Sequence, residues 1–308
     1  MSHSPHPDIR GSPWFVESVT ELTYHGVDIG LLEGGEDLVE LILESTSDSL
    51  GLQDDDVLVV SSKVVSLAEE RIVDLEGVPV SERAERIADV TGIDPREVEL
   101  ILRESTVLGV IPVAEIAPGR LESYAVSSEA AAEALESLPS LLVTNWNGRL
   151  CTNAGIDLSN SPAETATLLP ADPNESARQL REEIRERSGT DVAVVIADTE
   201  VSHRGGSVDI AIGCAGIDPV DSSFGATDLF GNPKVGGVDL IADELAAGAA
   251  LLSGQAAERT PVVVVRGLEY EPNGGIETDA ELIRSGIWLT FKRTVQVKLA
   301  EYVPFRRS

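Results

Sequence analysis

Lysine is scarce in this sequence. The 308 residues contain 53 Asp and Glu against 23 Lys and Arg, a net charge of −30, and the lysines are Lys63, Lys234, Lys292 and Lys298. Self-repulsion at this charge would strain an ordinary fold, but at molar salt the Debye length falls to about 3 Å and the repulsion is screened. The composition therefore predicts a globular protein adapted to concentrated salt. It argues against nucleic acid as a partner, because phosphate backbones require Lys and Arg.

Cysteines and long apolar stretches are also lacking. Two cysteines, Cys151 and Cys214, do not make a disulfide framework and suit a reducing compartment. No apolar run reaches the ~20 residues of a membrane span, and the N-terminus lacks the apolar segment of a signal peptide. The 42% of hydrophobic residues recur in runs, which argues against an acidic disordered chain. We expect a cytoplasmic protein without membrane contact, with residues 1–20 as an N-terminal extension.

Apolar runs alternate with segments of helical spacing. The runs VLVV at 57–60, DVAVVIAD at 191–198 and TPVVVVRG at 260–267 are short and β-branched, as buried strands are. Asn147-Gly148 between two short apolar runs predicts a hairpin. Helices are predicted over 36–50, 81–90, 94–104, 126–138, 172–188 and 239–252. This alternation predicts an α/β fold with mixed sheets and helices.

Two segments could supply oxygen ligands to a metal or polar contacts to a ligand. Asp198-Thr199 follows a buried strand, where α/β proteins bind ligands, and two hard oxygen donors suit Mg²⁺ or Mn²⁺. A plain turn or helix cap explains Asp and Thr there equally well. Asp157 lies in a Gly/Asn/Ser-rich stretch with Asn160 three residues on, which also suits an ordinary surface turn.

Two further segments could approach phosphate. Ser62 and Lys63 follow the strand at 57–60, and Lys63 could meet a phosphate as a point charge or be a solvated surface lysine. SGQAAERT at 253–260 has small residues that let backbone N–H groups approach a ligand. The alternative for that segment is a helix-to-strand connection with Gly254 as the C-cap.

Taken together, these segments resemble one family, the coenzyme F420-0:L-glutamate ligases, also called F420 gamma-glutamyl ligases. The resemblance spans roughly residues 26–270 and is specific as an ordered set. It is carried by LLEGGEDLVE, VLVVSSKVVSLAEER, NAGIDLSN, LLPADPNESA, VIADT, VDIAIGCAGIDP, DLFGNP, ADELAAGAALLSGQ and TPVVVVRG.

The resemblance implies a GTP-dependent amide ligase of the halophilic archaeal type, built as a single intertwined catalytic unit of two lobes over 21–280. A C-terminal tail over 281–308 alternates like an edge strand. The substrates implied are GTP, L-glutamate and an F420-0-like acceptor, with two Mg²⁺ or Mn²⁺ ions, K⁺ as a further candidate ion, and a homodimer. The implied metal ligands are Asp157, Asp198, Thr199 and Gln255. The implied nucleotide-binding residues are Ile29, Gly30, Leu31, Leu32, Ser62, Lys63, Asn160, Ser253, Gly254, Gln255, Ala256, Ala257, Glu258, Arg259 and Thr260.

The chain departs from the family pattern in two places. Leu67 stands where the family has a lysine that contacts GTP, with Arg71 or Arg259 as candidate substitutes. The run after Asp198-Thr199 is one residue shorter and lacks the family's proline and aromatic residue, with Arg204 as a candidate stand-in for an arginine. Two alternatives follow from these departures: a paralogous GTP-dependent ligase with another acceptor or amine, and a non-catalytic nucleotide-binding protein.

Overall fold

The computed structural model divides the chain into two compact units. The first comprises Met1–Ile72 and Leu169–Ile276, and the second comprises Val73–Leu168 and Glu277–Ser308. The structure describes residues 21–32, 34–47, 50–116, 126–130, 132, 139–159, 164–202, 206–222, 225–233, 238–254, 258–276, 289–290 and 292–296. The mixture of helices and sheets confirms the predicted α/β class.

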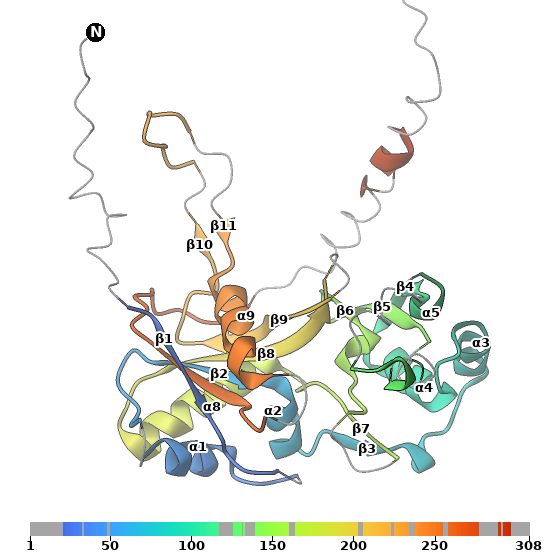
Figure 1. Ribbon diagram of the computed structural model, residues 1–308, viewed down its shortest axis with the longest axis horizontal. Helices are drawn as coiled ribbons and strands as arrows, with labels where there is room; N and C mark the ends of the chain where they lie inside the picture. Colours follow the sequence, from blue (N-terminus) through green and yellow to red (C-terminus); the bar gives the residue numbers. More distant parts are fainter. Residues whose placement is uncertain are drawn as a thin grey trace, which may run out of the picture. The chain divides into compact units, whose positions relative to one another are not determined.

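The first unit is built on a five-stranded mixed sheet in the order β1-β12-β2-β8-β9 (Figure 1). The strands β2 and β8 run parallel, and the other neighbouring pairs are antiparallel. The strands are β1 (Thr23–Val27), β2 (Val57–Ser61), β8 (Ala193–Val201), β9 (Ser207–Ala215) and β12 (Val262–Arg266). The apolar residues of β2 and β12, and those of β8 from Ala193 to Ala197, are buried, as expected for strands covered on both faces.

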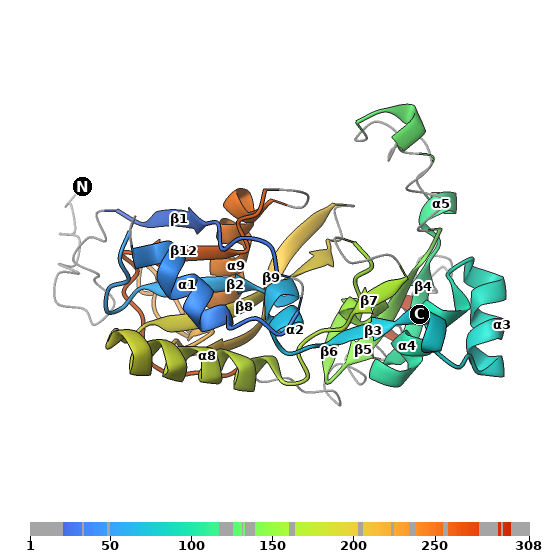
Figure 2. The ribbon, with the colours of Figure 1, turned by 90° about the horizontal axis from the view of Figure 1, so that it is seen from below.

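Helices cover both faces of this sheet. The helix α9 (Ile241–Ser253) packs on one face, in a core that includes Val59, Val195 and Ala197. The other face carries α8 (Pro173–Ser188), which packs on β8 and β9, and next to it α1 (Leu38–Ser47) and α2 (Ser62–Ala68). Figure 2, seen from below, shows α1 and α8 in front of the strands. A short arm, β10 (Asp221–Ser222) paired with β11 (Val238–Asp239), also belongs to this unit.

The second unit has a three-stranded antiparallel sheet in the order β4-β5-β6, with β3 and β7 pairing beside it. The hairpin predicted around Asn147-Gly148 is β5 and β6 of this sheet. The elements are β3 (Ile72–Asp74), η1 (Leu75–Gly77), α3 (Glu82–Thr91), α4 (Pro95–Glu104), β4 (Thr106–Ile111), α5 (Val113–Ile116), β5 (Leu141–Trp146), β6 (Arg149–Thr152), η2 (Asn153–Gly155) and β7 (Thr165–Thr167).

Most predicted elements are confirmed, and two are wrong in part. The strand at 191–198 does not end at Asp198, because β8 continues to Val201 as the antiparallel partner of β9. In the C-terminal tail, residues 289–290 and 292–296 are helical, not an edge strand. Most of the helix predicted at 126–138 lies outside the described residues. Within the described part of the chain, no helix has the length and apolar character needed to cross a bilayer.

Candidate functional site

The register of the first sheet brings four of the predicted segments to one end. Val27, the last residue of β1, pairs with Val262, the first residue of β12. The backbone N–H of Ser61 donates to the carbonyl of Pro261 at 2.8 Å, and Ser61 pairs with Ala197 of β8. The residues that follow β1, precede β12, follow β2 and continue β8 past Ala197 therefore meet at a single edge. This edge, called the site edge below, includes 28–32, 258–261, 62–63 and 198–199.

A hydrogen bond joins two predicted residues at the site edge. Ser62 is the first residue of α2, and its hydroxyl donates to Oδ1 of Asp198 at 2.6 Å. Ser62 is buried and Asp198 is half-buried. Because β2 and β8 are parallel, their ends carry both side chains to the same side of the sheet. The Asp198 carboxylate therefore lies at the rim of the core, where Ser62 orients it and where it remains partly exposed.

Asp198 and Thr199 lie on opposite faces of the sheet. The register of β8 and β9 shifts between Ile196 and Ala197, so a bulge precedes the two residues, as bulges often do at functional sites. Side chains then alternate along β8, with Asp198 toward α2 and Thr199 toward the α9 face. The Thr199 hydroxyl donates to Oδ1 of Asp209, its partner on β9, at 2.7 Å. Residues with alternating side chains can therefore present oxygen atoms on both faces of the edge.

The two predicted nucleotide-binding loops lie beside each other at the site edge. The Asp28 carboxylate accepts from the backbone N–H of Gly30 at 2.8 Å, and the Arg259 guanidinium lies 3.8 Å from the same carboxylate. Ile29 and Leu32 are 4% and 8% exposed, whereas Leu31 is 80% exposed. The side chains of Ile29 and Leu32 therefore belong to the core, and only the backbone of those two residues can meet a ligand.

Gly254 follows the last residue of α9 and is its C-cap, as the alternative interpretation of this segment expected. Gly254 has a φ of +67°, and a Cβ atom there would lie 2.2 Å from Cδ of Glu258. The Glu258 side chain could move away from a larger residue, but the positive φ of Gly254 is a backbone conformation that favours glycine. Gln255, Ala256 and Ala257 lie outside the described residues, as do Asn160 and Arg204.

The helix α2 shows how the departure at Leu67 is accommodated. Leu67 is 8% exposed, so it packs as a core residue and offers no polar group to a nucleotide. Its neighbour Ser66 is 1% exposed, and its hydroxyl has no hydrogen-bond partner among the described residues. Lys63, one residue after Ser62, is half-buried at the site edge.

The two serines of α2 should respond oppositely to alanine. Ser66→Ala removes an unsatisfied buried hydroxyl, so we expect the free energy of unfolding to rise by about 1 kcal/mol. Ser62→Ala removes a hydrogen bond to a carboxylate, so we expect a fall of roughly 1–3 kcal/mol. Denaturant unfolding of both variants in the same high-salt buffer measures the signs. A Ser66→Ala variant as destabilised as Ser62→Ala would show that the Ser66 hydroxyl is satisfied.

Asp157, the remaining predicted metal ligand, belongs to the second unit. It follows η2, and its backbone pairs with Thr167 through two hydrogen bonds of 3.0 and 2.9 Å. Its Oδ1 accepts from the backbone N–H of Ser159 at 2.7 Å, which closes a local turn. Just before it, Ala154 has a φ of 56°, a conformation unusual for a residue with a side chain. Asp157 is thus held in a defined turn and half-exposed.

The oxygen donors at the site edge suit a hard divalent cation. Asp198 supplies a carboxylate and Thr199 a hydroxyl, the ligand types that Mg²⁺ and Mn²⁺ prefer. Among the described residues there is no cluster of three or more His, Cys, Asp or Glu side chains that could hold a metal by themselves. Because the two donors lie on opposite faces of the sheet, each fits an ion that takes the rest of its coordination from phosphate oxygens and water.

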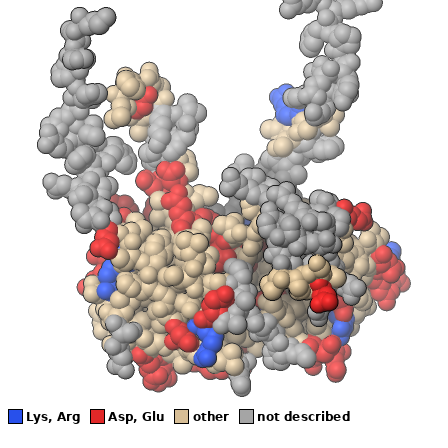
Figure 3. Space-filling view, in the orientation of Figure 1, with Lys and Arg blue, Asp and Glu red and all other residues tan. Residues whose placement is uncertain are grey.

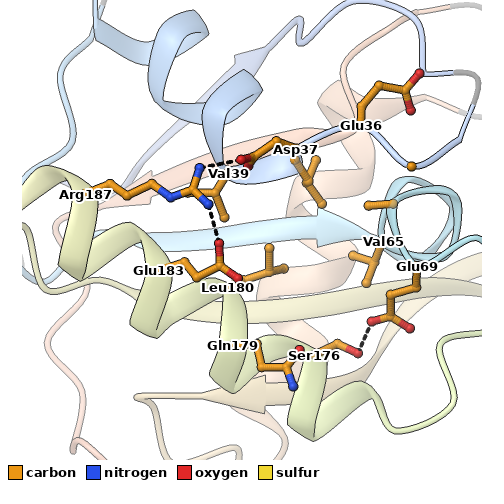
Figure 4. A pocket seen from close by; sticks show the side chains of 13 residues that line it. Glu36, Asp37, Val39, Val65, Glu69, Ser176, Gln179, Leu180, Glu183 and Arg187 are labelled. Carbon is orange, nitrogen blue, oxygen red and sulfur yellow. Dashed lines mark hydrogen bonds and ion pairs between the residues drawn. The ribbon is translucent and has the colours of Figure 1, made fainter.

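A separate hollow lies between α1, α2 and α8 of the first unit, with a volume of about 330 Å³ (Figure 4). Its charged rim is paired internally: Arg187 contacts Asp37 and Glu183, both at 2.6 Å, and Ser176 donates to Glu69. The Arg187–Asp37 contact joins the start of α1 to α8, and the Ser176–Glu69 contact joins the end of α2 to α8. The charged side chains in these pairs already have partners within the protein. None of the predicted site residues that the structure describes lines the hollow.

Comparison with known proteins points to one family. Residues 26–267 match the F420-0:Gamma-glutamyl ligase family. The chain is 38% identical over 256 residues to the coenzyme F420:L-glutamate ligase of Archaeoglobus fulgidus, covering 83% of this chain and 90% of that protein. It is 37% identical over 239 residues to that of Methanopyrus kandleri, covering 77% and 83%. It is 33% identical over 263 residues to that of Halobacterium salinarum, covering 83% and 92%.

These matches confirm the resemblance carried by the ordered motifs. They run through both units, and they include every described residue of the site edge together with Asp157. The chain belongs to the F420-0:gamma-glutamyl ligase family and is a ligase.

Proposed function

We propose that this chain uses GTP and two divalent cations to join L-glutamate to F420-0 through an acyl phosphate. One observation carries the proposal: the family's separate motifs converge at the site edge, where Ser62 holds Asp198 and Thr199 faces Asp209. Family membership supports the glutamate and F420-0 substrates, because the relatives carry the name coenzyme F420:L-glutamate ligase.

The proposal gives roles to residues of the site edge and to three residues outside it, Asp157, Gly254 and Gln255. Asp198 and Asp157 would bind cations, with Thr199 and Gln255 completing the second ion's ligands. Ser62 fixes the rotamer of Asp198 through the 2.6 Å hydrogen bond. Gly30 and Gly254 let the backbone approach the nucleotide, and Arg259 and Lys63 supply positive charge. When bound, the cations would neutralise phosphate charge in a protein with few lysines and polarise the transferred phosphoryl group.

The proposed reaction has two displacements. The carboxylate of F420-0 attacks the γ-phosphorus of GTP, which forms an acyl phosphate and releases GDP. The amine of glutamate then attacks the acyl carbon, the amide bond forms, and phosphate and a proton leave. The first step converts a poor leaving group into phosphate, which an amine can displace.

An oxygen-isotope experiment tests this chemistry. F420-0 labelled with ¹⁸O in its carboxylate is incubated with purified protein, GTP, Mn²⁺ and glutamate in high salt. The proposal expects one labelled oxygen in the released phosphate, because the carboxylate oxygen departs with the phosphoryl group. Unlabelled phosphate with amide product would overturn the acyl phosphate.

A second candidate is supported by the burial of Leu67, which stands where the family has a GTP-contacting lysine. A paralogous ligase with the same nucleotide chemistry but another acid or amine would consume GTP without F420-0, in the presence of its own substrates. A non-catalytic nucleotide-binding protein would bind GTP with Mn²⁺ in calorimetry and turn over none of it. Incubations with F420-0, and without F420-0 but with a panel of other carboxylic acids and amines, separate the three outcomes.

Salt and compartment belong to the same proposal. Figure 3 shows Asp and Glu at many places on one face of the molecule and few Lys and Arg. Cys151 and Cys214 are both buried, and in the described part of the chain neither is in a disulfide, which suits a reducing cytoplasm. We propose a cytoplasmic enzyme whose activity requires concentrated salt, with K⁺ as the candidate monovalent ion.

We also propose that the chain forms a homodimer through the arm tip, residues 227–233. Asp228 fixes this tip, because its carboxylate accepts from the backbone N–H groups of Phe230 and Asn232, both at 2.8 Å. These backbone hydrogen bonds, with the Asn232 backbone as the largest cause, lower the pKa of Asp228. The ordered turn presents Leu229 and Phe230 at 69% and 87% exposure. A turn fixed by hydrogen bonds that exposes two large apolar side chains favours a contact in which a second copy of the chain buries those side chains.

Charge at the arm tip should disrupt this dimer. We expect Phe230→Asp to convert the protein from dimer to monomer, because a carboxylate cannot be buried cheaply in an apolar contact. Val90 on α3 is similarly exposed at 83%, so Val90→Asp is a matched control that should leave the dimer unchanged. Sedimentation velocity in high salt gives the masses. A Phe230→Asp variant that sediments as the wild type would place the contact elsewhere.

A further inference from the structure

A carboxylate on β9 accompanies the predicted ligand Thr199. Thr199 and Asp209 are direct cross-strand partners, and the Thr199 hydroxyl donates to Oδ1 of Asp209 at 2.7 Å. Asp209 is half-buried. The family motif VDIAIG contains this residue, yet the motif by itself gives it no role. Its position opposite Thr199 follows only from the register of the two strands.

The surroundings place this pair on one face of the sheet. Ala197 and Ala211 lie two residues before Thr199 and two residues after Asp209, and both belong to the core that α9 covers. Side chains alternate along strands, so Thr199 and Asp209 continue that face beyond the apolar core. Asp198 lies on the opposite face with Ser62. The edge therefore carries two separate hydroxyl–carboxylate pairs, one on each face.

The two pairs differ in which member is the predicted metal ligand. In the first pair the carboxylate of Asp198 is the predicted ligand and the serine hydroxyl orients it. In the second pair the threonine hydroxyl is the predicted ligand, and the carboxylate accepts its only proton. Because the hydroxyl proton of Thr199 points at Asp209, only the lone pairs of its oxygen remain to contact another group, such as a cation. The negative charge of the acceptor also makes that oxygen a better donor to a cation.

We propose that Asp209 is a positioning residue, which fixes the Thr199 hydroxyl so that its oxygen faces the cation accompanying GTP. The proposal rests on the proposed function, since it assumes that Mn²⁺ and GTP bind at the site edge. Asp209 acts through Thr199 and does not itself contact the nucleotide.

Binding of Mn²⁺, measured without turnover, tests this role. Free Mn²⁺ is followed by electron paramagnetic resonance in the presence of GTP, with no acceptor or glutamate, for wild type, Asp209→Ala, Asp209→Asn, Thr199→Val and the Thr199→Val/Asp209→Ala double variant. We expect Asp209→Ala to weaken Mn²⁺ binding about tenfold to a hundredfold, the range found for residues that orient metal ligands. Asp209→Asn should bind close to wild type, because its amide oxygen still accepts from Thr199. Asp221→Ala, an exposed carboxylate on β10, is the control.

The double variant decides how Asp209 acts. If Asp209 works through Thr199, its removal has no further effect once Thr199 is valine. A full additional loss in the double variant, unchanged binding by Asp209→Ala, or an asparagine variant as weak as the alanine variant would each overturn the proposal. Wild-type protein that binds no Mn²⁺ with GTP would instead overturn the proposed function and this inference with it. Thermal unfolding of each variant confirms that the fold is retained.

Discussion

Asp198→Asn removes metal-dependent GTP turnover and leaves the fold intact. The asparagine oxygen still accepts the hydrogen bond from Ser62, so the local structure has no reason to change. The negative charge that would hold a cation is lost. Charge stabilisation by a catalytic metal amounts to several kcal/mol, and about 3 kcal/mol corresponds to at least a hundredfold in rate. GTP consumption measured in saturating glutamate and F420-0 gives the size of the loss.

A matched substitution separates this effect from a general change of surface charge. Asp54 lies in the turn before β2, at the opposite end of the same sheet, where it accepts from the backbone N–H of Asp191 at 2.8 Å. Asp54→Asn makes the same chemical change there and should retain full turnover. Unchanged turnover in Asp198→Asn, with circular dichroism like that of the wild type, would remove Asp198 from the site.

Glu97→Gln stabilises the second unit at neutral and alkaline pH. Glu97 on α4 is 6% exposed and accepts a hydrogen bond from the Asn153 amide at 3.2 Å. Burial, and secondarily the charge of Asp94, raises the pKa of Glu97 from 4.5 to about 7. Glutamine keeps the acceptor oxygen for Asn153 and carries no charge. The variant therefore avoids the cost of an ionised carboxylate in the core.

The sign of the pH dependence follows from proton binding. Between pH 4.5 and about 7 the folded protein holds a proton on Glu97 that the unfolded chain has released. Below pH 4.5 the ionisation of Glu97 therefore costs the wild type no folding stability. As the pH rises to about 7, the free energy of unfolding of the wild type falls by up to roughly 3 kcal/mol. Glu97→Gln should gain about that much at pH 8 and little at pH 5.

Denaturant unfolding at the two pH values measures this difference. Glu85 on α3 is exposed, so Glu85→Gln provides a control for the loss of one negative charge. The control should change stability by the same small amount at both values. A gain in Glu97→Gln that is equal at pH 5 and pH 8 would show that Glu97 is ionised to the same extent in folded and unfolded protein.

Local signals in the sequence predicted most of the fold. Asp94 caps α4 by accepting from the backbone N–H of Arg96 at 2.8 Å, with Pro95 at the first helical position as predicted. Asp172 caps α8 in the same way, accepting from Glu175 at 3.1 Å. Such caps, and buried β-branched strands such as β2, depend only on neighbours in the chain. They could therefore be read without knowledge of the tertiary fold.

The site was predicted as a set of segments, but its geometry was not. Nothing local to Asp198 shows that β8 continues to Val201, because that continuation depends on the partner strand β9. The same pairing places Asp209 against Thr199, ten residues apart in the chain. The burial of Ile29 and Leu32 likewise depends on packing within the first unit rather than on their own residue types. The length of β8 and the position of Asp209 depend on the pairing register between strands, which the local sequence pattern does not determine.

The C-terminal tail shows that an alternating sequence pattern alone does not establish a strand. The tail was predicted as an edge strand from its alternating apolar and polar residues, yet residues 289–290 and 292–296 are helical. A strand needs a partner edge, and a short alternating run has no strand preference strong enough to act without one. In the residues described, the tail has no paired edge, so local helix formation prevails.

One incubation tests the proposed ligase most directly. Purified protein in high salt is supplied with GTP, Mn²⁺, L-glutamate and F420-0, and the products formed from F420-0 are analysed by mass spectrometry, with single omissions as controls. A functioning glutamate ligase gives a product heavier than F420-0 by one glutamyl residue, which disappears when GTP, Mn²⁺ or glutamate is left out. Consumption of GTP without that product, or no consumption at all, would contradict F420-0:glutamate ligation by this chain.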